Sequence, residues 1–139
     1  MKTELIEITD KVISPAQVIN RARTSGSGCV ATYVGLIRDN SHGKKVASVE
    51  YQDKTGKAAS GLRKIAAETK EKWAVENIAF THRIGILKVG DINLVIAVAA
   101  GHRGEAFAAC QYVIDRFKES IPTYKIETYL DGSTLDGGS

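Results

Sequence analysis

The sequence lacks the patterns that would support a metal centre, thiol chemistry or a membrane span. Its two cysteines, Cys29 and Cys110, lie far apart and form no CxxC pair, and its three histidines show no metal-ligand spacing. No apolar run approaches the roughly 18 residues of a membrane helix, and the first residues contain no apolar stretch typical of a signal peptide. These absences favour a cytoplasmic protein without a structural metal.

The chain also lacks a strong charge of either sign. It has 19 basic and 16 acidic residues and a net charge of +3, which argues against a protein that coats nucleic acid but allows a local basic pocket. With 139 residues, it is long enough for one domain with a hydrophobic core. We expect a single domain over residues 1–132 and a frayed tail over residues 133–139.

Hydrophobic patterning predicts alternating strands and helices. Ser14 and Pro15 are typical of a helix start, and apolar spacing predicts further helices at residues 57–73 and 104–120. Residues 29–37 predict a central strand, followed by a polar, mobile loop at residues 38–45. Other strands are predicted at residues 3–9, 46–52, 77–85, 92–100 and 123–130, and residues 86–91 are expected to form a short strand and a turn. This order predicts an α+β fold with three helices and a mixed or antiparallel sheet.

The last helix has an apolar stripe that we expect to face the core. The stripe comprises Phe107, Cys110, Val113, Ile114, Phe117 and Ile121. Pro122 ends this helix, because the residue before a proline avoids the α region. Lys118 and Lys125, on either side of the proline, therefore belong to different elements and can converge.

Basic side chains gather where strands and helices are predicted to end. Arg38 follows a strand, His102 and Arg103 precede the last helix, Lys118 lies in its last turns, and Lys125 enters the next strand. Helix N-termini and strand ends are places where anions bind. Taken singly, Lys118 can also serve the helix dipole, and Arg38 can be a solvated loop residue.

Two further basic residues, His82 and Arg83, occupy neighbouring positions within a predicted strand. Neighbouring side chains of a strand point to opposite faces. At most one of the two is therefore expected to reach a site.

The length of the last helix limits what one copy of the chain can do. Arg103 and Lys118 are fifteen residues apart, which places them about 22 Å apart along a helix. One small substrate cannot touch both ends. If both ends serve one pocket, a second copy must supply one of them, and the protein is a homodimer with a shared site.

Five motifs occur in register along the chain: "YVGLIRDNSHG" (33–43), "HRIG" (82–85), "VGD" (89–91), "GHRGEAF" (101–107) and "FKESIPTYK" (117–125). Together they resemble the large, catalytic subunit of molybdopterin synthase. The resemblance extends from about residue 3 to residue 132. It implies an α/β hammerhead-type fold with an added antiparallel β subdomain.

The resemblance also implies an activity and partners. The family transfers sulfur to cyclic pyranopterin monophosphate, also called precursor Z, to form the molybdopterin dithiolene of the molybdenum cofactor. The sulfur arrives as a thiocarboxylate on the C-terminal Gly-Gly of a small ubiquitin-like partner. Two large subunits form a central dimer within a heterotetramer. No cofactor is implied, because the pterin is the substrate and the partner supplies the sulfur.

Carried over by motif, Lys118 and Lys125 match the two active-site lysines, and Arg38 matches the arginine that ends the "VGLIR" strand. His102 and Arg103 match the pair that reaches the substrate from the other large subunit. By position, the same pocket is expected to contain Leu36, Ile37, Ile126 and Glu127.

The implied chemistry accounts for a cluster of cations. A cyclic phosphate calls for arginine, histidine and lysine donors, and sulfur transfer requires stabilised negative charge and a proton donor. A lysine crowded by cations has a lowered pKa and can exchange protons nearer neutrality. Our hypothesis places Lys118 at the thiocarboxylate and Lys125 at the pterin.

Two alternatives remain from the sequence. One is a non-enzymatic module that binds a nucleotide or nucleic acid, recognisable by binding that weakens steeply with salt and needs no protein partner. The other is a family member that keeps the dimer but has lost activity. The short ending "STLDGGS" and the pair Thr123-Tyr124 depart from the family pattern, which bears on how the partner docks.

Overall fold

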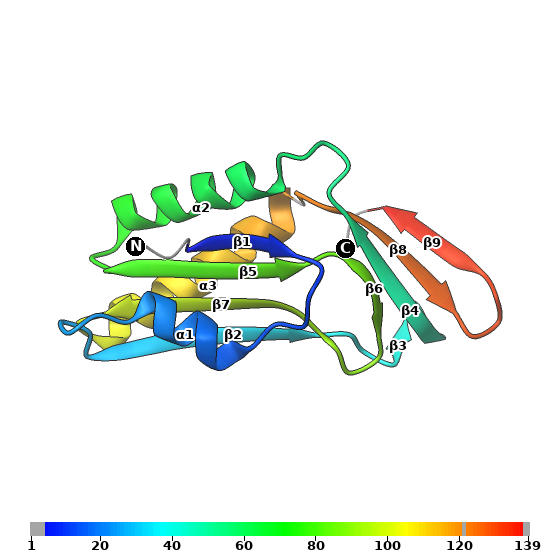
Figure 1. Ribbon diagram of the computed structural model, residues 1–139, viewed down its shortest axis with the longest axis horizontal. Helices are drawn as coiled ribbons and strands as arrows, with labels where there is room; N and C mark the ends of the chain where they lie inside the picture. The colour runs from blue at the N-terminus through cyan, green and yellow to red at the C-terminus, as the bar shows by residue number, and fades with distance from the viewer. Residues whose placement is uncertain (1–4, 121, 138–139) are drawn as a thin grey trace.

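The computed structural model describes residues 5–120 and 122–137, and within them the chain forms three helices and nine strands (Figure 1). The strands make two sheets, one of four strands and one of five. The predicted α+β class with three helices is confirmed. None of the described helices is long and apolar enough to cross a membrane.

The four-stranded sheet contains, in order, β1 (Ile6–Thr9), β5 (Asn77–Arg83), β7 (Ile92–Ala100) and β2 (Cys29–Leu36). β1 is parallel to β5 and the other neighbours are antiparallel, so the sheet is mixed. The predicted central position of residues 29–37 is wrong, because β2 pairs only with β7 among the described strands. β7 is central instead, since its residues are buried on both faces.

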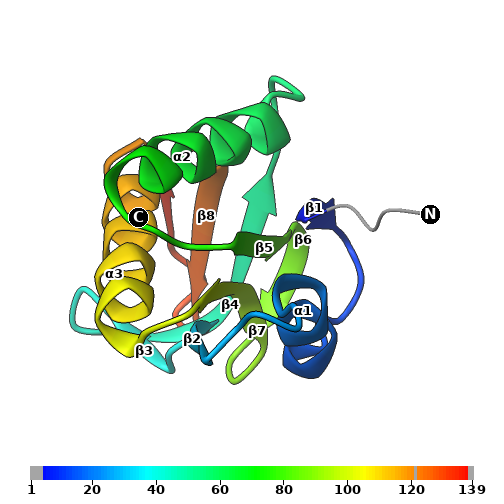
Figure 2. The ribbon, with the colours of Figure 1, turned by 90° about the vertical axis from the view of Figure 1, so that its left-hand side faces the viewer.

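The three helices cover both faces of this sheet (Figure 2). α1 (Pro15–Ala22) lies on one face, and α2 (Ala58–Lys72) and α3 (Arg103–Ser120) lie on the other. The predicted cap of α1 is confirmed, because Ser14 Oγ accepts a hydrogen bond from the backbone N–H of Gln17 at 3.3 Å. The two buried layers hold the sheet between them.

The apolar stripe of α3 differs from the prediction at Phe107, which is 66% exposed. The buried stripe consists of Ala106, Ala109, Cys110, Val113, Ile114 and Phe117. Phe107 is about 100° around the helix from Ala106 and lies at the margin of this stripe. The predicted stripe residue Ile121 lies outside the described residues, as do the first two residues of the strand predicted at 3–9.

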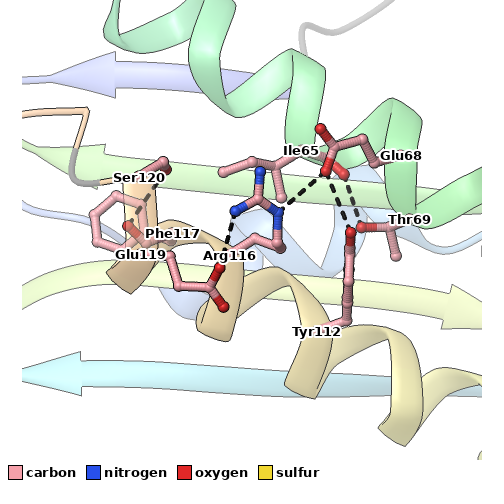
Figure 3. A network of polar contacts seen from close by, with 8 residues as sticks. All are labelled: Ile65, Glu68, Thr69, Tyr112, Arg116, Phe117, Glu119 and Ser120. Atoms are coloured by element: carbon pink, nitrogen blue, oxygen red, sulfur yellow. Dashed lines mark hydrogen bonds and ion pairs between the residues drawn. The ribbon is translucent and has the colours of Figure 1, made fainter.

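A polar network fixes the second half of α3 against α2 (Figure 3). The Glu68 carboxylate accepts hydrogen bonds from Tyr112 Oη and Arg116 Nε, both at 3.2 Å. Arg116 also donates to Glu119 at 3.1 Å. These hydrogen bonds lower the pKa of Glu68, chiefly through Arg116. The turn of α3 that carries Lys118 is thereby tied to a neighbouring helix.

The five-stranded sheet contains β3 (Asn40–Ser41), β4 (Lys44–Gln52), β8 (Tyr124–Tyr129) and β9 (Thr134–Gly137) in order, while β6 (Gly85–Lys88) pairs with β4. The two sheets lie next to each other along the long axis of the molecule (Figure 1). Its small core is formed by Ile37, Val46, Val49, Leu87 and Tyr129.

The mobile loop predicted at residues 38–45 is largely a hairpin. Asn40 pairs with Lys45 and Ser41 with Lys44, which leaves a two-residue turn. His42 and Gly43 both have positive φ, 52° and 76°, as a tight hairpin turn of this length requires. Polar composition alone did not reveal this pairing.

The frayed tail predicted at residues 133–139 is also wrong over most of its length. Thr134–Gly137 form β9 and pair with β8. The turn before β9 is closed by Asp131, whose carboxylate accepts from the backbone N–H of Ser133 at 2.8 Å, and by Gly132 with φ 88°. Asp-Gly is a typical hairpin signal. Residues 138 and 139 lie outside the described residues.

Candidate active site

A cavity of about 130 Å³ lies where the two sheets meet. β4 contributes Tyr51, β7 contributes Asn93, α3 contributes Lys118, and β8 contributes Lys125. A smaller adjoining cavity is lined by the same four residues together with Leu94, Phe117 and Thr123. These four residues therefore form the boundary between the two spaces.

The chain reversal after α3 brings the two lysines to this cavity. α3 ends at Ser120, Pro122 follows, and β8 begins at Tyr124. In β8 the register places Lys125 opposite Tyr51. Lys118 and Lys125 line the same cavity, as predicted from the helix break between them.

The cavity lowers the pKa of Lys118. The largest cause is removal of water by the surrounding protein, followed by the positive charges of Lys125 and Arg38. The direction agrees with the sequence prediction, but desolvation contributes more than the cations do. Lys118 stays open to solvent, so a proton can reach and leave its amino group.

A buried carboxylate balances part of this positive charge. Glu127 is 5% exposed, and its Oε1 lies 3.8 Å from Lys125 Nζ. The same oxygen accepts a hydrogen bond from Ser41 Oγ at 3.2 Å and lies 3.9 Å from His42 Nε2. Glu127 thus joins Lys125 to the hairpin formed by β3 and β4.

Most of the residues predicted for the pocket line this one cavity. They are Leu36, Ile37, Arg38, Lys118, Lys125 and Glu127. Ile126 does not line it, because Ile126 lies between Lys125 and Glu127 on β8 and points to the opposite face of the sheet.

His102 and Arg103 lie away from the cavity within one chain. Arg103 begins α3, whereas Lys118 is in its last turn, and Figure 1 shows these ends far apart along the helix. Both residues are exposed. Their predicted contact with the substrate through a second copy of the chain stays a prediction.

His82 and Arg83 do not line the cavity, but His82 lies directly behind it. Its ring is fully buried and meets the rings of Tyr51 and Phe117 edge to face, at 5.1 and 5.4 Å. His82 Nδ1 donates to the Asn93 carbonyl oxygen at 3.0 Å, and Nε2 accepts from the Thr123 hydroxyl at 3.0 Å. Both ring nitrogens are satisfied in the neutral state.

Tyr51 and Asn93 were not identified from the sequence as parts of this site, and His82 was considered only with Arg83, as a pair of which at most one reaches a site. One signal was present: Asn93 is the one polar residue in the apolar run of residues 92–100. The structure explains its position, because Gly35 pairs with Leu94 while Leu36 pairs with Ile92, which leaves Asn93 as an extra residue in β7. Such bulges redirect a side chain and are frequent beside active sites.

Burial of His82 predicts that the protein loses stability in mild acid. Burial lowers its pKa from 6.5 to about 4, so the folded state resists protonation that the unfolded state accepts. The contribution of buried, neutral His82 to the unfolding free energy is complete above pH 6.5 and is lost as the pH falls from 6.5 towards about 4. The expected loss over this window is roughly 3 kcal/mol of unfolding free energy.

Urea unfolding at several pH values measures this loss. The His82→Gln variant should have a lower stability at pH 7 but a smaller decrease towards pH 4. His102→Gln is the matched control, because His102 is exposed, and it should decrease as the unmodified chain does. If the unfolding free energies of the unmodified chain and of His82→Gln fell equally between pH 7 and pH 4, His82 would not be the cause of the loss.

The fold and cavity together define a class: an α+β protein that holds cations at the junction of two sheets, suited to an anionic substrate. The family model described as "MoaE protein" matches residues 8–120. The chain therefore belongs to the MoaE protein family.

Two relatives named "Molybdopterin synthase catalytic subunit" illustrate the similarity. The one from Bacillus subtilis is 36% identical over 134 residues, which cover 96% of this chain and 85% of the relative. The one from Nostoc sp. is 39% identical over 128 residues, 91% of this chain and 78% of the relative. The solved structure of molybdopterin synthase from Staphylococcus aureus matches with a TM-score of 0.90, 31% identity and 99% coverage of both chains.

Proposed function

We propose that this chain is a molybdopterin synthase catalytic subunit, a sulfurtransferase of molybdenum cofactor biosynthesis. It transfers sulfur from the C-terminal thiocarboxylate of a small ubiquitin-like partner to cyclic pyranopterin monophosphate. The observation that carries this proposal is the cavity in which Lys118, Lys125 and Arg38 converge. The names of the relatives support the same activity.

The charge of the cavity suits both substrates. A thiocarboxylate and a cyclic phosphate are anions, and each binds well to lysine and arginine donors. Arg38 at the end of β2 and Lys125 on β8 supply two such donors. His102 and Arg103 of a second copy complete the set in this proposal, and the chain accordingly acts as a homodimer within a heterotetramer.

The two lysines have different surroundings and are assigned different roles. Lys118, whose pKa is lowered, can exchange a proton nearer neutral pH than an ordinary lysine. It is placed at the thiocarboxylate, where sulfur leaves the acyl group. Lys125 is ion-paired with Glu127 and is placed at the pterin, where a cation aids binding of the phosphate.

The reaction needs no resident cofactor or metal in this proposal, because the partner supplies sulfur and the cations supply the electrostatic stabilisation. The two cysteines, Cys29 and Cys110, are free, which agrees with imported sulfur and with a cytoplasmic location for the reaction.

Reconstitution tests this function. The purified chain is mixed with a thiocarboxylated sulfur carrier and cyclic pyranopterin monophosphate, and dithiolene product is followed. Product that depends on all three components is the expected result. A chain that binds the carrier but forms no product would contradict the activity. Nucleotide binding without the carrier that weakens steeply with salt would favour an anion-binding module instead.

A further inference from the structure

A tyrosine, Tyr51, lines the cavity together with both lysines. Tyr51 on β4 is directly opposite Lys125 on β8, and paired residues of two strands share one face of the sheet. Tyr51 also lines both cavities, as do Lys118 and Lys125. Tyr51 therefore lines the space where the substrates of the proposed function meet.

Asn93 orients this hydroxyl and leaves its proton available. Asn93 Nδ2 donates to Tyr51 Oη at 3.0 Å, so the oxygen is the acceptor. Within the described part of the chain this is the one hydrogen bond of the Tyr51 side chain. The phenolic proton can therefore be donated to a molecule in the cavity.

The position of Asn93 is itself fixed by close packing. Its side chain is buried, and a Cβ added to Gly35 would lie 2.3 Å from Asn93 Oδ1. Only glycine at position 35 leaves room for this arrangement. Asn93 Oδ1 is buried without a hydrogen-bond partner among the described residues, so Nδ2 is the amide atom through which the side chain makes its hydrogen bond to Tyr51.

The reaction requires a donor of the kind that Tyr51 provides. Release of sulfur from an acyl group passes through a state in which the acyl oxygen carries negative charge, and a fixed neutral donor stabilises that charge. Burial, and to a smaller degree the charge of Glu127, raises the pKa of Tyr51. The phenol thus keeps its proton while the nearby Lys118 exchanges one.

We propose that Tyr51, oriented by Asn93, is a catalytic residue that donates a hydrogen bond to the acyl oxygen of the sulfur carrier's terminal group. The inference rests on the proposed function. The step begins from the acyl thioester that joins the carrier to the pterin substrate: water adds to its acyl carbon, and the bond between that carbon and the sulfur breaks. The electron pair of the broken bond stays on the substrate sulfur, and the carrier keeps a carboxylate. Of the two protons that the water gives up, one goes to the neutral form of Lys118 and the other to the substrate sulfur, which leaves as a thiol.

The Tyr51→Phe variant tests the role of the hydroxyl. It keeps the ring that meets His82 and removes only the donor, so kcat should fall about 10- to 100-fold with a small change in the KM for the carrier. Tyr124→Phe is the matched control. Tyr124 belongs to the same pair of strands and lies opposite Gln52, but its side chain is on the other face of β8. The kcat of Tyr124→Phe should therefore be unchanged.

A second variant separates positioning from direct contact. Asn93→Ala keeps the backbone carbonyl that accepts from His82 and removes the donor to Tyr51. It should lower kcat in the unmodified chain but add little to Tyr51→Phe, because Asn93 acts through Tyr51. Thermal unfolding of each variant establishes that the fold is kept.

The outcomes are distinct. If the unmodified chain forms product and Tyr51→Phe is as active as Tyr124→Phe, the role of Tyr51 is wrong while the proposed function stands. If Asn93→Ala lowers kcat by the same factor in the unmodified chain and in Tyr51→Phe, Asn93 does not act through Tyr51 and the proposal is overturned. A chain that forms no product at all refutes the proposed function, and the role of Tyr51 with it.

Discussion

Replacing Lys118 by alanine is expected to abolish formation of the dithiolene product. Lys118 is the cavity lysine whose pKa is lowered by desolvation and by the neighbouring Lys125 and Arg38. Alanine removes both its positive charge and its exchangeable proton. A loss of proton transfer alone lowers a rate by about 10²- to 10⁴-fold, and the loss of charge stabilisation adds to it.

The same substitution is expected to leave the fold and the dimer intact. Lys118 is exposed at the cavity, so its truncation creates no void in the core. Its lowered pKa means that folding disfavours its charged form, and removal of the charge carries no electrostatic penalty. Thermal unfolding and analytical ultracentrifugation measure these properties.

Lys70→Ala provides the matched control for Lys118→Ala. Lys70 is also an exposed lysine in the last turn of a helix, α2, but it does not line either cavity at the sheet junction. Its activity should equal that of the unmodified chain. Normal turnover by Lys118→Ala would show that the central residue assignment is wrong.

A second large loss of activity is expected from Arg103→Ala. Within one chain, Arg103 is exposed at the start of α3, and Lys118 is at the other end, about 22 Å away along the helix. Arg103 can therefore reach a substrate only in the cavity of a second copy. Losing one charged donor to a phosphate should raise the KM for the pterin by about 10- to 100-fold.

Steady-state kinetics with varied pterin concentration measures this effect. Arg23→Ala is the control, because Arg23 is an exposed arginine at the end of α1. If Arg103→Ala has the KM and kcat of the unmodified chain, the substrate does not contact the start of α3, and the shared site is wrong.

The helices and most strands could be predicted from the sequence because their signals are local. Ser14 and Pro15 mark the start of α1, and Pro122 follows the end of α3 at Ser120. The position of β2 at a sheet edge could not be predicted in this way, because it depends on which distant strands pair. The hairpin at His42 and Gly43 could not be predicted either, because its polar composition is equally typical of a loop.

The cations of the site could be predicted because each lies at the end of an element and within a motif. The uncharged members could not, because their roles follow from long-range geometry. Tyr51 faces the cavity through its register with Lys125, and Asn93 does so through a bulge in β7. From the sequence, His82 is one of two strand residues that could reach a site. Its burial behind the cavity depends on packing against Phe117, which lies far away in the sequence.

Mixing two variants, at a pterin concentration low enough that neither alone has appreciable activity, tests the central claim, that Lys118 of one copy and Arg103 of another serve one site. Lys118→Ala and Arg103→Ala chains are unfolded together, refolded, and assayed with carrier and pterin. Half of the dimers formed at random contain one chain of each kind, and each such dimer has one complete site. The account predicts about a quarter of the activity of the unmodified protein. A mixture that forms mixed dimers but stays inactive would contradict it.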